Sequence, residues 1–368
     1  MPNSIDTAVV FHEPGRFAGW PANYGMWRWG DEIVVGFTVG AHRTVASGHA
    51  IDKRQPFFNM QARSIDGGRS WNSEPFKGNL PGGRGLSADE HMAAGLRLAE
   101  VMDAGTATVP PSPLDFSATD SALMLARTGL GRGVFSFFYV SDDRCHSWAG
   151  PYRLPDFGAT GIAARTDVIL QGAQTATFFL TANKSDGDEG RVICVRTRDG
   201  GRSFQLLSQV GADLAARGDF AIMPGSVQLR NETLLCARRC RIGTSGLSHI
   251  DLFASDDLGE SWRRISQPVA FQRPGHSGNP PCLLALRDGR LALLYGNRDS
   301  YAICARLSED GGINWGGETL LRGGGANGDM GYVRAVELDD GTVVAAYYFN
   351  DAPGGDGERF IEATRWQP

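Results

Sequence analysis

The sequence predicts an all-β protein, a β-propeller of six blades, with a ring of seven blades as the alternative. Glycine makes up 49 of the 368 residues, and no long run of Leu, Ala, Glu and Lys indicates a helical bundle. One pattern, Ser/Thr-x-Asp-x-Gly-x-Ser/Asn-aromatic, begins at residues 64, 141, 197, 255 and 308. A repeat of roughly fifty residues is typical of a four-stranded propeller blade.

The five copies of this pattern, called boxes here, are predicted to be turns and not catalytic centres. Each box follows a strand-like run, such as VFSFFYV before Ser141, and a short strand comes after it. The Asp carboxylate of a box can accept backbone N–H groups, and its Gly, replaced by Cys145 in the second box, supplies a positive φ. The aromatic residue is expected to pack on the neighbouring blade. Glu309 and Asp310 of the last box are therefore poor catalytic candidates.

A strand, a polar turn and a second strand recur along the chain, for example in residues 283–298 and 333–350. Residues 1–368 are predicted to form a single propeller domain. The last blade has no box, so the run from Thr7 to Phe11 is expected to complete it and close the ring. The blades are predicted near residues 20–78, 115–152, 160–207, 220–265, 277–320 and 330–366.

Residues 80–115 are predicted to leave the ring as an inserted excursion that shapes a binding site. Ser87 is an N-cap candidate and Glu90 stands at the capping-box position, which indicates one short helix. The sequence PPSP at 110–113 then marks a loop. A seventh blade hidden in this segment is the alternative.

Charge and composition exclude several classes of protein. The net charge is −5 with both signs interspersed, which argues against a nucleic-acid binder. No apolar stretch reaches the length of a membrane span, and no signal peptide is visible, so a cytoplasmic location is expected. The six cysteines form no CxxC pair and are expected to be reduced thiols. No metal site or cofactor is predicted, and the oligomeric state is left open.

The five boxes match the Asp-box of the sialidase (BNR-repeat) superfamily, and the chain resembles that superfamily over nearly its whole length. Such enzymes use an arginine triad for the substrate carboxylate, a tyrosine nucleophile paired with a glutamate, and an aspartate acid/base. The resemblance places Tyr332, in GYVRAVELDDG, at the nucleophile position. It places Arg298, in GNR, and either Arg238 or Arg239 at two positions of the triad.

The chain also departs from the sialidase pattern. GWPAN at 19–23 stands where the family has Arg-Ile-Pro, and MPGS at 223–226 stands where its glutamate is expected. The chain is similar to a bacterial subgroup of sialidase-like proteins that share GWPAN, GIAARTD, GNPP, GY-x-R and IEATRW. Some relatives on such propellers resemble α-L-rhamnosidases or ulvan-type lyases that act beside uronic acids.

The loops that enter the innermost strands of a propeller converge near its axis, so the residues at these entrances are candidates for a site. Arginines there can bind a carboxylate bidentately, although each can instead pair with a neighbouring Asp. Tyr332 needs a nearby group that lowers its pKa, and Asp167 or Asp329 is the candidate second group. The candidate catalytic residues are His42, His49, Asp167 and Tyr332. The candidate substrate-binding residues are Asn23, Arg165, Arg238, Arg239, His276, Asn279, Arg298 and Arg334.

Three functions remain open from the sequence. The leading one is a glycoside hydrolase that resembles exo-sialidases and acts on a small oligosaccharide bearing a sialic or uronic acid. The second is a polysaccharide lyase or rhamnosidase-like enzyme on uronate-containing glycans, for which histidines and Tyr332 would transfer protons. The third is a non-catalytic glycan-binding propeller.

Overall fold

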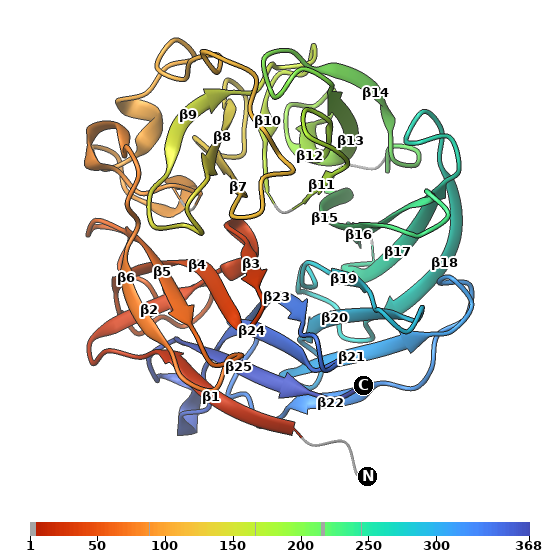
Figure 1. Cartoon of the computed structure of the whole chain (residues 1–368). Coiled ribbons are helices and arrows are strands. Elements are labelled where there is room, and N and C mark those ends of the chain that lie inside the picture. Colours follow the sequence, from red (N-terminus) through yellow and green to blue (C-terminus); the bar gives the residue numbers. More distant parts are fainter. Residues whose placement is uncertain (1–4, 88, 166, 215–217, 244) are drawn as a thin grey trace.

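The computed structural model describes residues 5–87, 89–165, 167–214, 218–243 and 245–368. Six small antiparallel sheets stand in a ring, one sheet to a blade (Figure 1). The predicted six-bladed, all-β propeller is therefore confirmed. Among the described residues, no helix is long and apolar enough to cross a membrane.

The strands follow the chain blade by blade. Blade one holds β2 (Arg16–Gly19), β3 (Met26–Trp29), β4 (Glu32–Ala41), β5 (Phe58–Ser64) and β6 (Asn72–Pro75), and blade two holds β7 (Ala122–Arg127), β8 (Ser136–Ser141) and β9 (Ala149–Arg153). Blade three holds β10 (Ile162–Ala163), β11 (Val168–Leu170), β12 (Ala176–Asn183), β13 (Glu189–Thr197) and β14 (Gln205–Gln209). Blade four holds β15 (Phe220–Gln228), β16 (Leu234–Ile242), β17 (Leu247–Ser255) and β18 (Arg263–Ala270). Blade five holds β19 (Cys282–Ala285), β20 (Leu291–Asn297), β21 (Ala302–Ser308) and β22 (Thr319–Arg322), and blade six holds β23 (Gly331–Glu337), β24 (Val343–Phe349), β25 (Phe360–Trp366) and β1 (Ile5–Phe11).

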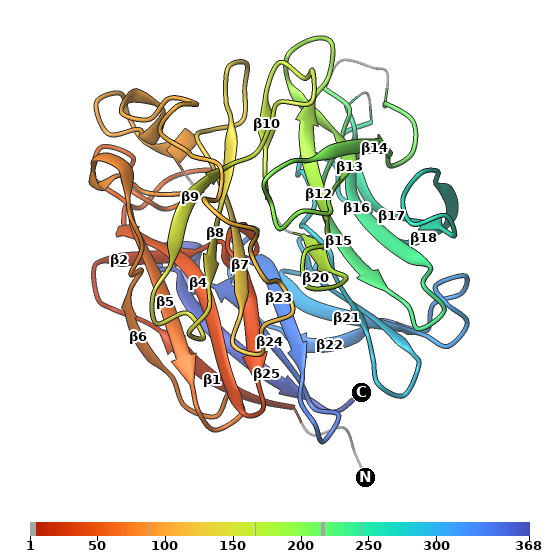
Figure 2. The same cartoon turned by 45° about the horizontal axis from the view of Figure 1, so that its top comes forward.

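The first strand of the chain is the outer strand of the last blade. β1 pairs antiparallel with β25, from Ile5 opposite Trp366 to Phe11 opposite Ile361, and the two strands lie side by side in both ribbon views (Figures 1 and 2). Alternation along β1 buries Val10 and exposes Val9. This pairing joins the two ends of the chain and covers an edge that would otherwise be open.

Each box is a turn between two antiparallel strands. In the last box, the Ser308 hydroxyl and the Asn314 amide N–H both donate to Asp310 Oδ1, at 2.9 Å each. Trp315 reaches the preceding blade, where its indole N–H donates to Ser266 Oγ at 3.2 Å. The second box keeps the same turn without glycine, because Cys145 takes a φ of 66° and donates its N–H to Ser141 Oγ.

The excursion at residues 80–115 contains three short 3-10 turns, η2 (Pro81–Gly83), η3 (Asp89–His91) and η4 (Leu98–Glu100). They replace the single α-helix expected from Ser87 onward, whose second residue, Ala88, lies outside the described residues. Ser87 has a φ of 53°, and Gly95 one of 87°, so the backbone leaves the helical region on both sides of η3. The remaining 3-10 turns are η1 (Pro21–Asn23) and η5 (Pro353–Gly355).

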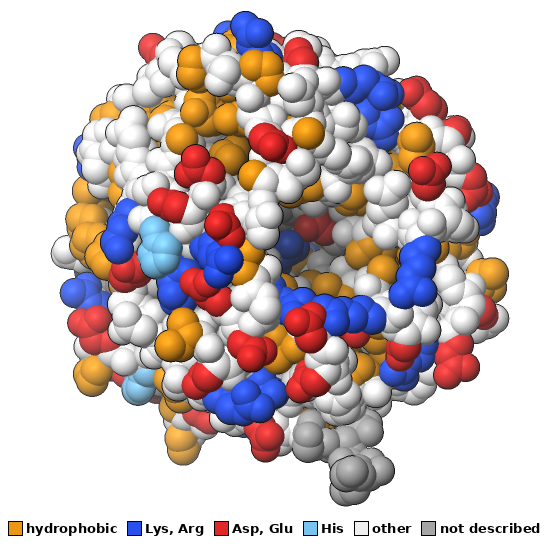
Figure 3. Space-filling model, viewed as in Figure 1, with side chains coloured by type: hydrophobic (Ala, Val, Ile, Leu, Met, Phe, Trp, Pro, Cys, Tyr) orange, Lys and Arg blue, Asp and Glu red, His pale blue; other side chains and the backbone are white. Residues whose placement is uncertain are grey.

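The apolar core lies within and between the blades. Every residue of the inner strand β7 and of β24 is buried, and apart from Arg127 at the end of β7 the residues of both strands are apolar or aromatic. The six cysteines are free thiols inside this core. Figure 3 shows one face of the ring, hollowed at its centre, with acidic and basic side chains interspersed over the blades.

Candidate active site

A bulge at the start of the innermost strand of blade six directs Tyr332 into a cavity. The register of β23 against β24 shifts between Gly331 and Arg334, and Tyr332 takes a φ of 54°. The side-chain oxygen of Asn279 accepts the Tyr332 N–H at 3.0 Å, while Gly331 packs so closely on Asn279 that any Cβ would clash. Such an extra residue re-aims a side chain, and here it brings the phenol to the cavity wall.

Three arginines from different blades act on the Tyr332 phenol. Arg165 precedes β11, Arg239 lies on β16, and Arg298 follows β20. Arg165 and Arg239 are buried, and Arg165 also pairs with Glu189. Burial opposes ionisation of the phenol, but the positive charges of Arg239, Arg165 and Arg298 outweigh it and lower the Tyr332 pKa below its usual value.

The arginines are held in place by hydrogen bonds. Arg239 donates from Nε to the carbonyl oxygen of Ser277 at 2.6 Å, and from Nη1 to the Met223 sulfur at 3.3 Å. Arg298 reaches the Ser277 hydroxyl at 3.4 Å. Burial and the neighbouring Arg127 lower the pKa of the Arg165 guanidinium to about 9, which leaves it charged at neutral pH. The cluster is therefore a fixed positive site beside a tyrosine.

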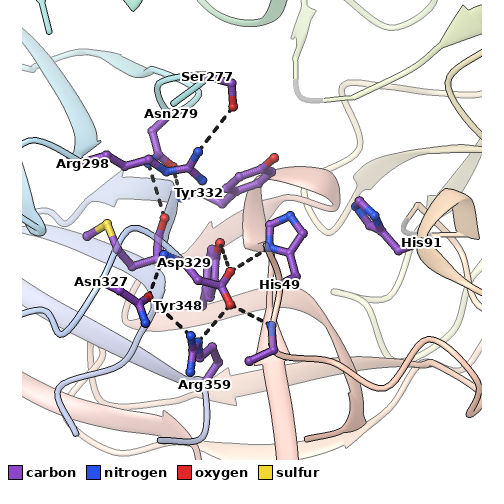
Figure 4. Close-up of polar contacts among 12 residues, drawn as sticks. His49, His91, Ser277, Asn279, Arg298, Asn327, Asp329, Tyr332, Tyr348 and Arg359 are labelled. Atoms are coloured by element: carbon purple, nitrogen blue, oxygen red, sulfur yellow. Dashed lines mark hydrogen bonds and ion pairs between the residues drawn. The ribbon is translucent and has the colours of Figure 1, made fainter. Parts of the chain in front are cut away.

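An aspartate–histidine pair stands next to the tyrosine (Figure 4). His49 Nδ1 lies 2.7 Å from Asp329 Oδ1, and the Tyr348 hydroxyl donates to the same oxygen at 3.0 Å. The other oxygen, Oδ2, accepts the Ala50 N–H at 3.0 Å and Arg359 Nε at 2.9 Å. Burial would raise the Asp329 pKa, but His49 and Arg359 lower it to about 2.

This arrangement fixes the orientation of the His49 ring. Asp329 is ionised above about pH 2 and holds a proton on Nδ1 of His49. The second nitrogen, Nε2, is then left to accept or donate a proton, and His49 lines the cavity. The same logic orients the histidine of a hydrolase triad, with the buried carboxylate acting only through the ring.

A second histidine and a tryptophan complete this wall. The His91 ring stacks on Trp20 with centroids 5.1 Å apart, and it meets His49 edge-on at 5.0 Å. Burial lowers the His91 pKa to about 4 against the pull of Glu90, so this imidazole is neutral at neutral pH. Glu90 itself pairs with Arg127 at 2.8 Å.

The cavity among these residues, called the tyrosine cavity, has a volume of about 200 Å³. Its walls mix ionisable groups with the apolar side chains of Leu130, Phe220 and Ile222. Five of the predicted site residues line it, and these are Asn23, His49, Arg165, Arg239 and Tyr332. Asn279 lies behind the wall, fully buried, and supports the bulge.

Four predicted residues lie away from the tyrosine cavity. Asp167 forms an ion pair with Arg334 at 3.1 Å and also accepts the Ser226 N–H. Arg238 lies over the Phe253 ring at 4.4 Å and donates to the Val210 carbonyl oxygen. His42 lines a separate hollow near β1 and blade six, so it does not share a cavity with His49.

Arg298 and His276 line a second hollow of about 570 Å³ that adjoins the first. His49 and Ser277 belong to the walls of both hollows. His276 is committed to Asp299, with Nε2 2.9 Å from its carboxylate. The second hollow is called the arginine chamber below, after Arg241, Arg273, Arg298 and Arg359 in its lining.

Sequence reasoning missed several residues of the tyrosine cavity. Arg127 ends the buried strand β7, and Glu189 begins β13, where neither position carries a motif. Ser277, which holds two arginines, is also missed. His91 follows Glu90 in the excursion. This pairing of a titratable histidine with a carboxylate was the one feature of the sequence that could have indicated a functional role for His91.

One group of possible metal ligands occurs among the described residues, Cys240, His249 and Asp251. Arg264 already binds Asp251 Oδ1 at 2.7 Å, and Arg238 lies 3.8 Å from the same carboxylate. Two guanidinium groups this close disfavour a cation. The group is best described as a charge network on the outer part of blade four.

The chain is similar in structure to a protein of unknown function from Dyadobacter fermentans, with 18% identity and a TM-score of 0.71 over 100% of both chains. The NanB sialidase of Streptococcus pneumoniae matches with 12% identity and a TM-score of 0.61, over 98% of this chain and 70% of that one. The α-L-arabinofuranosidase Arb93A of Fusarium graminearum matches with 12% identity and a TM-score of 0.61, over 98% and 96%. No family model and no curated protein matches the sequence. The resemblance to sialidases is therefore confirmed for the fold.

Proposed function

We propose that this propeller is a glycan-active enzyme whose substrate carries a carboxylate on the sugar that enters the tyrosine cavity. The observation that carries the proposal is the cluster of Arg165, Arg239 and Arg298 around Tyr332. Guanidinium groups bind carboxylates bidentately, and burial strengthens this attraction. The cavity volume of about 200 Å³ suits one sugar ring rather than a polymer segment.

The first candidate reaction is glycoside hydrolysis. Tyr332, as phenolate, attacks the anomeric carbon, and the bond to the leaving oxygen breaks as His49 Nε2 protonates that oxygen. His49 then takes a proton from water, which displaces the tyrosine and restores the enzyme. A tyrosine nucleophile is useful because the arginines that bind the substrate also stabilise the phenolate.

A second candidate, β-elimination by a lyase, is favoured by a separate observation. Three carboxylates at the tyrosine cavity and its His49 wall are committed to cations: Glu90 to Arg127, Glu189 to Arg165, and Asp329 to Arg359. No unpaired carboxylate among them is left for acid/base work. Elimination beside a uronate needs a neutralised carboxylate, a base and an acid, and the arginines, Tyr332 and His49 supply these groups.

Product masses separate the two reactions. Wild type is incubated with a panel of uronate-bearing and sialylated oligosaccharides, and products are identified by mass spectrometry. Fragments that sum to substrate plus water establish hydrolysis, whereas fragments that sum to the intact substrate, one of them unsaturated, establish elimination. We expect Tyr332→Phe to lower kcat/KM by at least about 1,000-fold, because it removes a group that bonds to the reacting centre.

The matched control is Tyr152→Phe, on β9 and away from the tyrosine cavity. It should leave turnover unchanged. Full activity of Tyr332→Phe would contradict the proposed role of Tyr332. The absence of turnover by wild type on every substrate would favour the non-catalytic glycan-binding propeller instead.

A further inference from the structure

The arginine chamber carries more positive charge than the proposed reaction uses, because Arg241 and Arg273 take no part in that reaction. Its lining includes Arg241, Arg273, Arg298 and Arg359, with Asp329 as the carboxylate among the lining residues. Asp329 is fully occupied by Arg359 and His49. A chamber of about 570 Å³ with surplus arginines stands out on a chain whose net charge is −5.

Three of these arginines have no anionic partner among the residues that the structure describes. Within the described ranges, no carboxylate lies within ion-pair distance of Arg241, Arg273 or Arg298, although most other arginines at the two hollows are paired. The Nε atoms of Arg241 and Arg298 are buried and donate to no acceptor among the described residues. An unsatisfied buried donor of this kind is unfavourable unless water or a bound ligand supplies the acceptor.

The third arginine is held by an aromatic ring. The Arg273 guanidinium lies 5.1 Å from the centre of the Tyr301 ring and donates to its hydroxyl at 2.7 Å. The loop that carries it is tied down where Asp299 accepts the N–H groups of Gln272 and Arg273. The contact with Tyr301 therefore holds the Arg273 guanidinium in place, although residue Arg273 is exposed to solvent.

The chamber adjoins the tyrosine cavity at His49. His49 and Ser277 line both hollows, and Arg298 binds Ser277 from the chamber side while it acts on Tyr332 (Figure 4). If one sugar fills the tyrosine cavity and His49 protonates the leaving oxygen, the next sugar extends past His49 into the chamber. The unpaired arginines then face that second sugar.

We propose that the arginine chamber is a binding site for an oxyanion on the leaving-group side of the substrate. The substrate is then an oligosaccharide in which the sugar next to the one cleaved off is also anionic, through a carboxylate or a sulfate ester. This inference rests on the proposed function for the orientation of the substrate. The anion site itself can be tested without any turnover.

Two probes distinguish the two anion chemistries: selenate, a tetrahedral divalent oxyanion, and malonate, which carries planar carboxylates. Binding is measured by isothermal titration calorimetry at low salt, where exposed charges are least screened. We expect Arg273→Gln, and more strongly Arg241→Gln with Arg273→Gln, to weaken binding of the preferred probe at least about tenfold. Arg202→Gln, in the exposed third box, is the matched control and should bind as wild type does.

The position of the anion is read from crystals soaked in selenate, whose selenium gives an anomalous signal. A peak among Arg241, Arg273 and Arg298, absent in the double variant, supports the chamber site. No peak there, or equal binding by wild type and the double variant, overturns it. Tyr332→Phe should still bind the anion in the chamber. A loss of turnover in Tyr332→Phe and a loss of anion binding in the arginine variants are therefore independent results.

Discussion

Tyr332 is the residue whose chemistry depends most on its neighbours. A free tyrosine ionises near pH 10, and burial alone would raise that value. The charges of Arg239, Arg165 and Arg298 act in the opposite direction and lower the Tyr332 pKa. By contrast, burial raises the pKa of Tyr348, whose hydroxyl keeps its proton and donates a hydrogen bond to Asp329. The pKa values of these two neighbouring tyrosines are therefore shifted in opposite directions.

The first prediction concerns this ionisation. A difference absorbance titration of wild type against Tyr332→Phe should show one phenol that ionises below the pH range of ordinary tyrosine. In Arg239→Gln its pKa should rise, because one stabilising charge and a donor to the phenolate are removed. A Tyr332 titration that is the same with and without Arg239 would contradict the electrostatic account. Arg202→Gln serves as the charge-matched control.

The second prediction concerns Asp329 and the pH dependence of stability. Its pKa is about 2 in the folded protein and about 3.9 in an unfolded chain, so folding is favoured by the ionised form. The resulting stabilisation, on the order of 2–3 kcal/mol, is fully present above about pH 4 and is lost as the pH falls toward 2. Asp329→Asn should therefore be less stable by about 3–5 kcal/mol at neutral pH, since Arg359 also loses its partner.

Urea unfolding at several pH values checks this expectation. The difference between wild type and Asp329→Asn should narrow as the pH falls from about 4 toward 2. Asp142→Asn, at an exposed position in the second box, should match wild type throughout. A constant difference across this pH window would show that Asp329 does not titrate as described.

At the scale of the element, the boxes were readable from sequence because each uses only local contacts. Asp310 bonds residues within four positions of itself, so the pattern of residue types is enough to predict the turn. The bulge of β23 was not readable in the same way. Tyr332 turns inward because Asn279, 53 positions earlier, holds its N–H, and only the folded ring brings the two together.

The third prediction compares the two carboxylates of the last box. Asp310→Ala removes the acceptor for Ser308 Oγ, Asn314 N–H and Asn314 Nδ2, and it should reduce the free energy of unfolding measurably. Glu309→Ala, at the exposed neighbouring position, should change it by less than about 0.5 kcal/mol. Thermal and urea unfolding measure both variants. Equal effects would show that the box does not stabilise its blade through the Asp310 carboxylate.

At the scale of the whole molecule, the repeated boxes predicted a ring of blades. The ring in turn brings together the residues of the tyrosine cavity, which lie far apart in the sequence. Tyr332, Arg239, Arg298 and His49 come from four blades, and their convergence follows once six blades are counted. The ion-pair partners of the arginines could not be predicted from the number of blades. Asp167 and Arg334 both stand at inner entrances, yet they bind each other and leave the cavity to Arg165, because side-chain direction at an entrance depends on local bulges.

The last prediction tests how the ring is closed. Val10 is 5% exposed and packs in the core between blades six and one, whereas Val9, its neighbour on β1, is 57% exposed. Val10→Asp places a charge in that core and should reduce the free energy of unfolding by at least about 3 kcal/mol, while Val9→Asp should change it by less than about 0.5 kcal/mol. Because loss of β1 uncovers the backbone of β25, Val10→Asp should also self-associate at high concentration, as light scattering would show. Equal stability of the two variants would mean that the ring holds together without the first strand of the chain.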